Sequence, residues 1–319
     1  MNVRKHIYNQ VIKKRLNEGL IGDEDNDTLR PDLKYYAFDW DDNIMFMPTK
    51  IMVLSENDDE IGMSTEDFAE HRLQIGQEPF KYKSATIINF AENPFRFFRE
   101  EGDKRFLMDC MMAPVGPAWN DFVECINGGS IFAIITARGH NPETLKEAVY
   151  NLIMSDKNGL NRKKLEESLR RYDLLANESL NENMRPRMST TIEQYLDMCK
   201  FHPVSYGSGS ATSPEEGKNK ALKQFISYCR EQAKNLVQFI LDNNPNIKLS
   251  DLTPKFKNDV AMSEPVEDVE EFVGEYTSLG FSDDDPRNIE ASSEFLNKEY
   301  EKSPVNLYLT KGGKKTRFN

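Results

Sequence analysis

The chain has 319 residues, of which 38 % are hydrophobic and 29 % are charged, and its formal net charge is −12. This composition is typical of a globular protein with a buried core, and no apolar run approaches the roughly 20 residues of a membrane-spanning helix. The acidic balance disfavours binding to nucleic acid or to an anionic membrane surface. We therefore expect a soluble protein with no membrane partner.

Two further features predict a cytoplasmic, intracellular protein. Residues 1–14 are basic but contain no apolar signal core, which argues against a secretory peptide. The cysteines are widely spaced, with no CxxC pair, and they are expected to be buried thiols in a reducing compartment. They are Cys110, Cys125, Cys199 and Cys229.

The first part of the chain predicts a helix, a linker, a strand and a hairpin, in that order. Residues 2–20 carry apolar side chains at helical spacing, and the acidic residues 22–27 follow as a linker. Residues 34–38 form a strand-like run. Two apolar runs on either side of residues 56–59 predict a hairpin, and a short helix with a serine or threonine cap is expected over 64–71.

The next stretch combines an irregular region with a strong strand and helix pattern. Residues 76–116 are rich in phenylalanine and methionine, and only 85–90 has a strand-like pattern. A helix is expected over 117–126, and the continuous apolar run 130–136 has the length of a buried strand. Residues 141–153 then predict another helix.

The last part of the chain alternates helices and strands. Residues 157–200 are expected to be largely helical and polar. Ser213, Pro214 and Glu216 have the spacing of a helix start, with the serine as N-cap. The other expected elements are strands at 203–207, 277–281 and 305–310 and helices at 264–276 and 288–300.

Continuous apolar strands that alternate with helices predict an α/β fold with a parallel sheet covered on both faces. In such sheets the functional side chains follow the carboxyl ends of strands near the point where the strand order reverses. Three predicted strands are followed by polar or acidic side chains. They are Asp39, Asp41 and Asp42 after the first strand, Thr136 and Arg138 after the second, and Asp283, Asp284 and Asp285 after the fourth. Carboxylates gathered at one sheet edge are stable around a hard cation such as Mg²⁺.

Four motifs in this order resemble those of the haloacid dehalogenase (HAD) superfamily. FDWDDN at 38–43 resembles the first motif, an apolar strand that runs into DxDx[TVN], and Thr136 ends a strand as in the second. Lys218 near a helix start resembles the third, with Lys220 as the alternative. The acidic cluster 283–285 resembles the fourth. The resemblance implies a HAD-like Rossmannoid parallel sheet, a cap inserted after the first strand, and bound Mg²⁺.

The resemblance also implies a chemical role for each motif. Asp39 is expected to attack phosphorus and form an aspartyl-phosphate, and Asp41 to protonate the leaving oxygen and then deprotonate water. Thr136 is expected to hydrogen-bond the transferring phosphoryl group. Lys218 is expected to neutralise charge on Asp39 and on the phosphoryl oxygens. Residues two apart in an extended chain point to one side, which suits the joint action of Asp39 and Asp41.

The same resemblance implies a set of Mg²⁺ ligands. These are Asp39, the backbone carbonyl of Asp41, and Asp284, with Asp283 as the next choice. Asn288 stands where many members of the superfamily place a further acid, and we expect it to orient the ligands.

Three other polar residues near the motifs have weaker expected roles. Arg138 is predicted either to contact a second substrate phosphate or to form a salt bridge with the acidic rim. Asn43 is expected to bind substrate together with Thr136, whereas Asp42 is interpreted as a polar neighbour without a role.

The motifs divide the chain into a core, insertions and terminal segments. The divisions are an N-terminal helix and acidic linker (1–33), a core (34–44 and 117–312) with a helical insertion (157–200), a flap and cap (45–116), and a basic tail (313–319).

The function that these observations predict is a Mg²⁺-dependent phosphatase that hydrolyses the phosphate monoester of a small metabolite or nucleotide. An acid at position 41 is the feature that, by resemblance, separates phosphatases from dehalogenases. One alternative is a polynucleotide end phosphatase, because TARG at 136–139 resembles a motif of such enzymes, although the acidic charge disfavours it. The other is a catalytically silent scaffold with this fold, against which the intact Asp39 and Asp41 argue.

Overall fold

The computed structural model describes residues 34–169, 191–206, 213–243, 248–252, 266, 268–299 and 305–318. The helix expected over 2–20, the linker after it, and residues 170–190 of the expected helical insertion lie outside the described residues. Within the described ranges, no helix is both long and apolar enough to cross a membrane. All four cysteines fall inside these ranges and are buried thiols, as expected.

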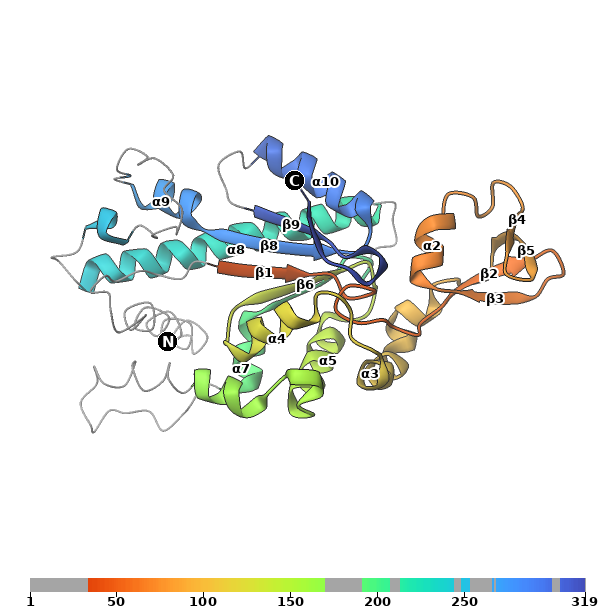
Figure 1. The fold of residues 1–319 in the computed structure, drawn as a ribbon, viewed down its shortest axis with the longest axis horizontal. Coiled ribbons are helices and arrows are strands. Elements are labelled where there is room, and N and C mark those ends of the chain that lie inside the picture. Colours follow the sequence, from red (N-terminus) through yellow and green to blue (C-terminus); the bar gives the residue numbers. More distant parts are fainter. Residues whose placement is uncertain are drawn as a thin grey trace.

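A six-stranded sheet forms the centre of the molecule, with the strand order β10-β9-β8-β1-β6-β7 (Figure 1). The strands are β1 (Lys34–Phe38), β6 (Phe132–Thr136), β7 (Lys200–Pro203), β8 (Ser278–Asp283), β9 (Val305–Leu309) and β10 (Thr316–Phe318). All neighbouring pairs are parallel except β9 and β10. The prediction of a parallel sheet is thus confirmed in part: the sheet is mixed, and most of its strand pairs are parallel.

The two ends of this sheet differ from the sequence-based expectation. The strand predicted at 203–207 lies earlier, at Lys200–Pro203, where it pairs with Ala133–Thr136 of β6. The strand β10 falls in the segment that was interpreted as a basic tail. Both are edge strands, which are held by backbone pairing on one side and tolerate lysine and arginine, so their sequences lack a clear apolar pattern.

Helices cover both faces of the sheet, as predicted. One face carries α4 (Trp119–Asn127), α5 (Pro142–Met154) and α7 (Ile192–Met198), and the other carries α8 (Pro214–Asn243) and α10 (Pro286–Glu299). Alternation along β1 decides which side chains meet which helices. Phe38 packs edge-on against Phe122 of α4, with ring centroids 5.5 Å apart, whereas Tyr35 and Ala37 join the cluster of Phe225 on α8.

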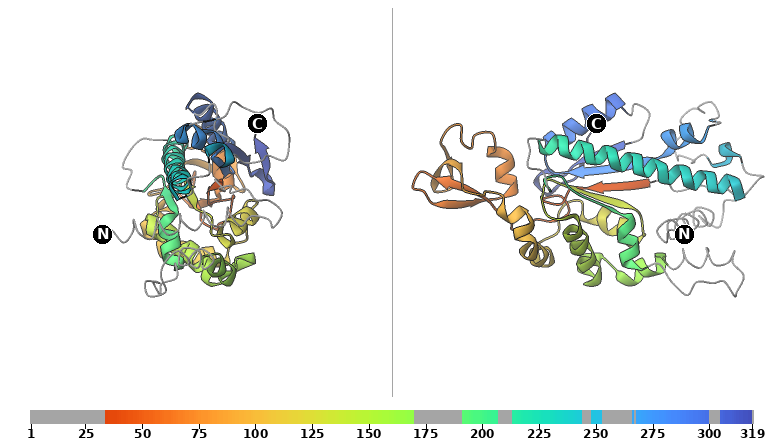
Figure 2. Two further views of the ribbon diagram at one scale, coloured as in Figure 1. Left: turned by 90° about the vertical axis from the view of Figure 1, so that its left-hand side faces the viewer. Right: turned by 180° about the vertical axis from the view of Figure 1, so that it is seen from behind.

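The expected start of α8 is confirmed, whereas α9 begins at Val269, later than the start expected at 264. Ser213 caps α8, because its hydroxyl accepts a hydrogen bond from the backbone of Glu216 at 3.2 Å. The helix α9 (Val269–Tyr276) begins after Asp268, whose carboxylate accepts from the first-turn backbone. It packs on the end of α8 that is remote from the carboxyl ends of the strands (Figure 2).

The segment between β1 and α4 forms a second, antiparallel sheet with the order β3-β2-β5-β4. Its elements are β2 (Ile51–Ser55), β3 (Glu60–Met63), α2 (Thr65–His71), β4 (Phe80–Tyr82), β5 (Ala85–Phe90) and α3 (Asp103–Met112). Figures 1 and 2 show this insertion beyond the carboxyl ends of the central strands. The predicted hairpin and the helix at 64–71 are confirmed.

The expectation of an irregular 76–116 was wrong in two places, β4 and α3. The helix α3 buries only Phe106 and Cys110, so it lacks the apolar stripe that identifies a helix in sequence. The α3 residues nevertheless carry the chain back from the insertion to the core.

A close backbone contact fixes where the chain returns from the insertion. The amide of Gly116 donates to the carbonyl of Ile44 at 2.9 Å, and the amide of Ala118 donates to that of Asn43 at 3.0 Å. A Cβ atom added at Gly116 would lie 2.3 Å from the carbonyl oxygen of Asn43. Only glycine permits this approach, which places the loop after β1 against the start of α4.

We predict that Gly116→Ala displaces the loop at 43–45 and lowers the free energy of unfolding by about 1–3 kcal/mol, as overpacking does in well-packed cores. Gly274→Ala is the matched control, since a Cβ at this α9 position meets nothing within 4 Å. It should leave stability unchanged or raise it by up to about 1 kcal/mol. Urea denaturation measures both, and equal stability of the two variants would contradict the assigned contact.

Candidate active site

The strand order brings three strand ends together beneath the insertion. From β1 the chain moves outward through β6 and β7, and it then crosses to the other side of β1 through α8 and β8. Phe38 at the end of β1 lies in register with Ile134 of β6 and Ser282 of β8. The order therefore reverses beside β1, which is where functional side chains gather in open α/β sheets.

A buried lysine joins the two predicted acidic motifs. The Nζ atom of Lys218 lies 3.2 Å from Oδ2 of Asp39 and 2.7 Å from Oδ2 of Asp283. Lys218 is 2 % exposed, whereas Lys220 is exposed to solvent. The structure thus places Lys218 at the site and Lys220 away from it. Burial by itself lowers the pKa of Lys218, but the carboxylates of Asp283 and Asp39 raise it above its ordinary value.

Asp39 combines burial with one oxygen that is open to a ligand. Burial raises the pKa of Asp39 to about 7; Lys218 opposes this rise, and the neighbouring Asp283 and Asp41 add to it. Its Oδ1 atom is buried and has no hydrogen-bond partner among the described residues. A carboxylate oxygen in this state is costly unless a cation or a substrate completes its surroundings.

Three carboxylates lie close enough to bind one cation. Oxygen atoms of Asp39, Asp283 and Asp284 lie within 4.8 Å of one another. Asp284 is partly exposed, and burial together with Asp283 and Asp39 raises its pKa well above the ordinary value. This oxygen-rich group, with the unpartnered Oδ1 of Asp39 beside it, fits Mg²⁺.

The hydrogen bonds of Asp283 distinguish it from its neighbours. Its Oδ1 accepts from the Asn288 amide at 2.9 Å and from the backbone of Asp285 at 3.0 Å, and its Oδ2 accepts from Lys218. These contacts favour Asp284 over Asp283 as the more available ligand, in line with the sequence-based preference. They also give Asn288 the orienting contact expected of it, and its own buried Oδ1 has no partner within the described part of the chain.

Asp41 is held by Arg138. The Nε atom of Arg138 donates to Oδ2 of Asp41 at 2.8 Å, and its Nη2 donates to Oδ1 at 2.6 Å. Arg138 is 1 % exposed. Of the two predicted roles for Arg138, the salt bridge is the one that the structure contains. The Asp41 carboxylate is thus directed toward Arg138, and the metal contact of its backbone carbonyl that the resemblance implies stays a prediction.

The insertion and its return segment enclose the Arg138 side chain. Its guanidinium lies 4.6 Å and 4.7 Å from the ring centroids of Phe98 and Phe106, and its Nη2 donates to the Thr49 hydroxyl at 3.0 Å. Its Nη1 lies 3.1 Å from Nε2 of His140. Sequence reasoning missed these contacts, because nothing in a strand or helix pattern links 49 and 98–106 to position 138.

His140 extends this network into the core. Burial and the neighbouring Arg138 lower its pKa, so the neutral ring accepts from Arg138 and donates Nδ1–H to Asp103 at 2.7 Å. Asp103 also accepts from the Thr144 hydroxyl at 2.8 Å. The His140 ring that contacts the Arg138 guanidinium is thus itself held in place by Asp103.

Two of the remaining predicted residues lie in different surroundings. Thr136 is 1 % exposed at the end of β6, lines the cavity, and its hydroxyl accepts from the amide of Arg138 at 3.4 Å. Asn43 does not line the cavity that was expected to hold substrate. Its amide donates to the backbone of Asp39 and Ser282, and its Oδ1 accepts from Thr310 at 2.9 Å. In the structure, Asn43 hydrogen-bonds to residues at the ends of β1, β8 and β9 and does not face the cavity.

Asp42 also departs from its expected place as a polar neighbour without a role. Its Oδ2 accepts from the hydroxyl of Thr65, the first residue of α2, at 2.5 Å. This bond joins the loop after β1 directly to the insertion. Burial raises the pKa of Asp42 to about 6, and the Thr65 hydrogen bond limits the rise.

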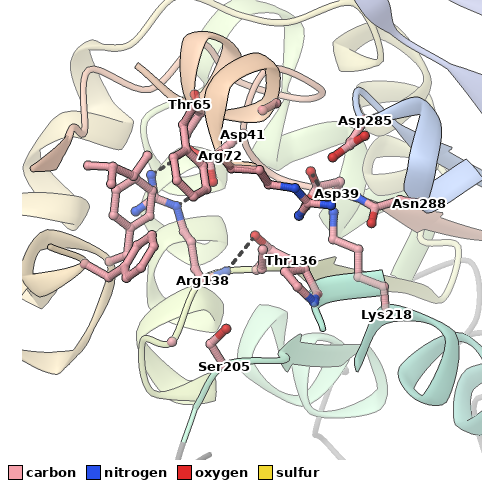
Figure 3. Close-up of a pocket in the computed structure, with 18 of the residues that line it drawn as sticks. Asp39, Asp41, Thr65, Arg72, Thr136, Arg138, Ser205, Lys218, Asp285 and Asn288 are labelled. Atoms are coloured by element: carbon pink, nitrogen blue, oxygen red, sulfur yellow. Dashed lines mark hydrogen bonds and ion pairs between the residues drawn. The ribbon is translucent and has the colours of Figure 1, made fainter. Parts of the chain in front are cut away.

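A cavity of about 470 Å³ separates the central sheet from the insertion (Figure 3). Its floor is polar and contains Asp39, Asp41, Thr136, Lys218 and Asp284. Its wall on the insertion side is largely apolar and contains Ile51, Phe68, Leu73, Phe90 and Phe95. The space is within the range of small-molecule sites and far larger than one phosphate requires.

Comparison of the chain with protein-family models, with curated proteins and with solved structures gave no match.

We predict that the free energy of unfolding of the metal-free protein falls as the pH rises from about 4 to about 7. The raised pKa of Asp39 means that the folded chain binds protons more tightly than the unfolded chain in this window, so deprotonation favours unfolding. Mg²⁺ should therefore raise the melting temperature more at pH 8 than at pH 5, because it binds the ionised carboxylates.

Thermal melts at both pH values, with Mg²⁺ and with a chelator, measure this effect. Asp39→Asn should reduce both the pH dependence and the Mg²⁺ shift, whereas Asp59→Asn, on the exposed hairpin turn, should behave as the wild type. A Mg²⁺ shift that is the same at both pH values would argue against the carboxylate site.

Proposed function

We propose that the protein is a Mg²⁺-dependent phosphohydrolase that cleaves a phosphate monoester through an aspartyl-phosphate on Asp39. The observation that carries the proposal is the state of Asp39: it is buried at a strand end, one oxygen is paired with Lys218, and the other has no partner among the described residues. The order of motifs that resembles the HAD superfamily supports the same reading, since Asp39, Thr136, Lys218 and Asp284 all line one cavity.

In the first half of the proposed reaction, a carboxylate oxygen of Asp39 attacks phosphorus as the bond from phosphorus to the leaving oxygen breaks. Asp41 gives a proton to that oxygen, and the alcohol leaves. In the second half, water attacks the phosphorus of the aspartyl-phosphate and Asp41 accepts its proton. Inorganic phosphate leaves, and Asp39 returns to its carboxylate form.

Lys218 and Thr136 stabilise the reacting phosphoryl group without taking part in proton transfer. The ammonium of Lys218 offsets the negative charge shared by Asp39 and the phosphoryl oxygens, and in this proposal the Thr136 hydroxyl donates to one of those oxygens. Asp39 and Asp284 would hold Mg²⁺, which would supply further positive charge to the transferring phosphoryl group.

Arg138 positions Asp41 in this proposal. In the free protein both oxygens of Asp41 accept from Arg138, so one of them has to be released for Asp41 to reach the leaving oxygen. Because the guanidinium is enclosed by two rings, a hydroxyl and a histidine, Arg138 stays in place while Asp41 changes partner.

We also infer that the insertion at 45–116 serves as a cap that excludes water during transfer. Two polar contacts join it to the core beside the cavity: Arg72 pairs with Glu215, and the Arg287 guanidinium donates to the backbone carbonyl of Ala69 at 2.8 Å. With Asp42 bound to Thr65, these contacts hold α2 over the strand ends.

We predict that Asp39→Asn lowers Mg²⁺-dependent hydrolysis of 4-nitrophenyl phosphate by about 10³-fold or more, because it removes the nucleophile. Lys218→Met should lower kcat by about 10²-fold or more, since a fixed charge at the reacting group is lost. Lys220→Met is the matched control and should keep wild-type kcat. Circular dichroism checks that each variant folds, and hydrolysis that survives Asp39→Asn would exclude Asp39 as the nucleophile.

A second prediction concerns Arg138. Arg138→Lys keeps the charge but loses the paired hydrogen bonds, so Asp41 should be less well placed to protonate the leaving oxygen. Poor leaving groups need this proton most, and kcat for glycerol phosphate should fall several-fold more than kcat for 4-nitrophenyl phosphate. Asp41→Asn should follow the same pattern with a larger loss, about 10²-fold or more on the alkyl substrate. Equal losses on both substrates would contradict the positioning role.

A further inference from the structure

The cavity has a second chemical face that hydrolysis of a phosphate group does not use. Besides Phe98, which packs on Arg138, three phenylalanines of the insertion line it: Phe68 from α2, Phe90 from β5 and Phe95 from the loop that follows. Each of them is only partly buried. Leu73, which lines the same space, is 76 % exposed. An apolar wall of this kind gains free energy when a ligand removes it from water.

The three rings form one assembly. Phe68 lies edge-on to Phe95 with centroids 5.6 Å apart and to Phe90 at 6.2 Å, and Phe90 and Phe95 are 5.9 Å apart. Mutual contacts of this geometry hold each ring in a fixed orientation. The wall is therefore a preformed surface on which a planar ring can pack, opposite the carboxylate floor.

The positively charged side chains around the cavity differ in whether a carboxylate of the protein already pairs with them. Lys218, Arg138, Arg72 and Arg287 each pair with a carboxylate of the protein. Arg99 also lines the cavity, is exposed, and has no side-chain ion pair among the described residues. Arg99 is thus a cation that remains available to attract an anion into a chain whose overall charge is −12.

From these three features we propose that the substrate is a nucleoside phosphate. Its phosphate lies on the floor beside Asp39, and Arg99 attracts its negative charge. Its planar base packs on the wall of Phe68, Phe90 and Phe95. A sugar provides the spacer between phosphate and ring that a floor and a wall on opposite sides of a 470 Å³ cavity require. The proposal rests on the phosphohydrolase function and names its substrate class. Figure 3 shows the floor residues and Arg72 converging on this pocket.

The test compares the four nucleoside 5′-monophosphates with ribose 5-phosphate. Both kinds of substrate release a primary alcohol from the same carbon, so they differ in the base and not in the leaving group. With Mg²⁺ present, kcat/KM for at least one nucleotide should exceed that for ribose 5-phosphate by about tenfold or more, the size of a ring-stacking contact. Equal values for ribose 5-phosphate and all four nucleotides would overturn the proposal.

Variants test the contribution of the apolar wall and that of the Arg99 charge separately. Phe95→Leu keeps an apolar side chain but removes the ring, and it should lower kcat/KM for the preferred nucleotide several-fold while leaving ribose 5-phosphate unchanged. Phe97→Leu is its control, since Phe97 lies outside the cavity lining. Arg99→Ala should weaken both substrates alike, most at low salt, and Arg105→Ala, on exposed α3, should weaken neither.

A calorimetric binding experiment distinguishes a failure of this inference from a failure of the proposed function. A nucleotide or ribose 5-phosphate is titrated into the Asp39→Asn variant in the presence of Mg²⁺. Tighter binding of a nucleotide than of ribose 5-phosphate, lost in Asp39→Asn combined with Phe95→Leu, supports the base site even if the wild type hydrolyses neither compound. In that case the phosphohydrolase function fails and the binding site stands. Hydrolysis of both compounds with equal rates and equal binding would leave the phosphohydrolase function standing and exclude the base site.

Discussion

The site depends on one buried cation among carboxylates. Lys218, at the start of α8, lies between Asp39, which follows β1, and Asp283, which ends β8. All three residues are almost fully buried. Without the lysine, two neighbouring carboxylates would be buried without a cation between them, which is strongly unfavourable. With it, one oxygen of each is satisfied and Oδ1 of Asp39 remains open. The crossover of α8 from one side of β1 to the other is what delivers this charge.

A second buried charge pair, Arg138 with Asp41, links the insertion to the same strand ends. The arginine comes from the loop after β6, but the rings and the hydroxyl that enclose it come from the insertion and its return segment. The position of the insertion and the position of Asp41 are therefore coupled through one guanidinium. The His140 ring and Asp103 complete the enclosure, so no polar atom of this group depends on water alone.

Much of the fold could be predicted because buried central strands and capped helices carry local patterns. The run that became β6 is continuous and apolar, those of β1, β8 and β9 are short runs in which apolar residues recur, and Ser213 marks the start of α8. The elements that escaped prediction are β10, β4 and α3, and β7 was predicted too late in the chain; these are edge strands or a helix with only two buried residues. Backbone pairing and contacts with distant segments stabilise them, and neither leaves a periodic pattern in the sequence.

The sequence by itself determined which side chains stand at the carboxyl ends of parallel strands, because apolar runs indicate where each buried strand begins and ends. It therefore identified Asp39, Thr136 and the 283–285 cluster as neighbours, and the resemblance to the HAD motifs added Lys218. Only the tertiary structure decided what each neighbour contacts. It paired Arg138 with Asp41, tied Asn43 to the backbone and joined Asp42 to α2. Such pairings depend on distances of a few ångströms between segments far apart in the chain, which residue spacing does not encode.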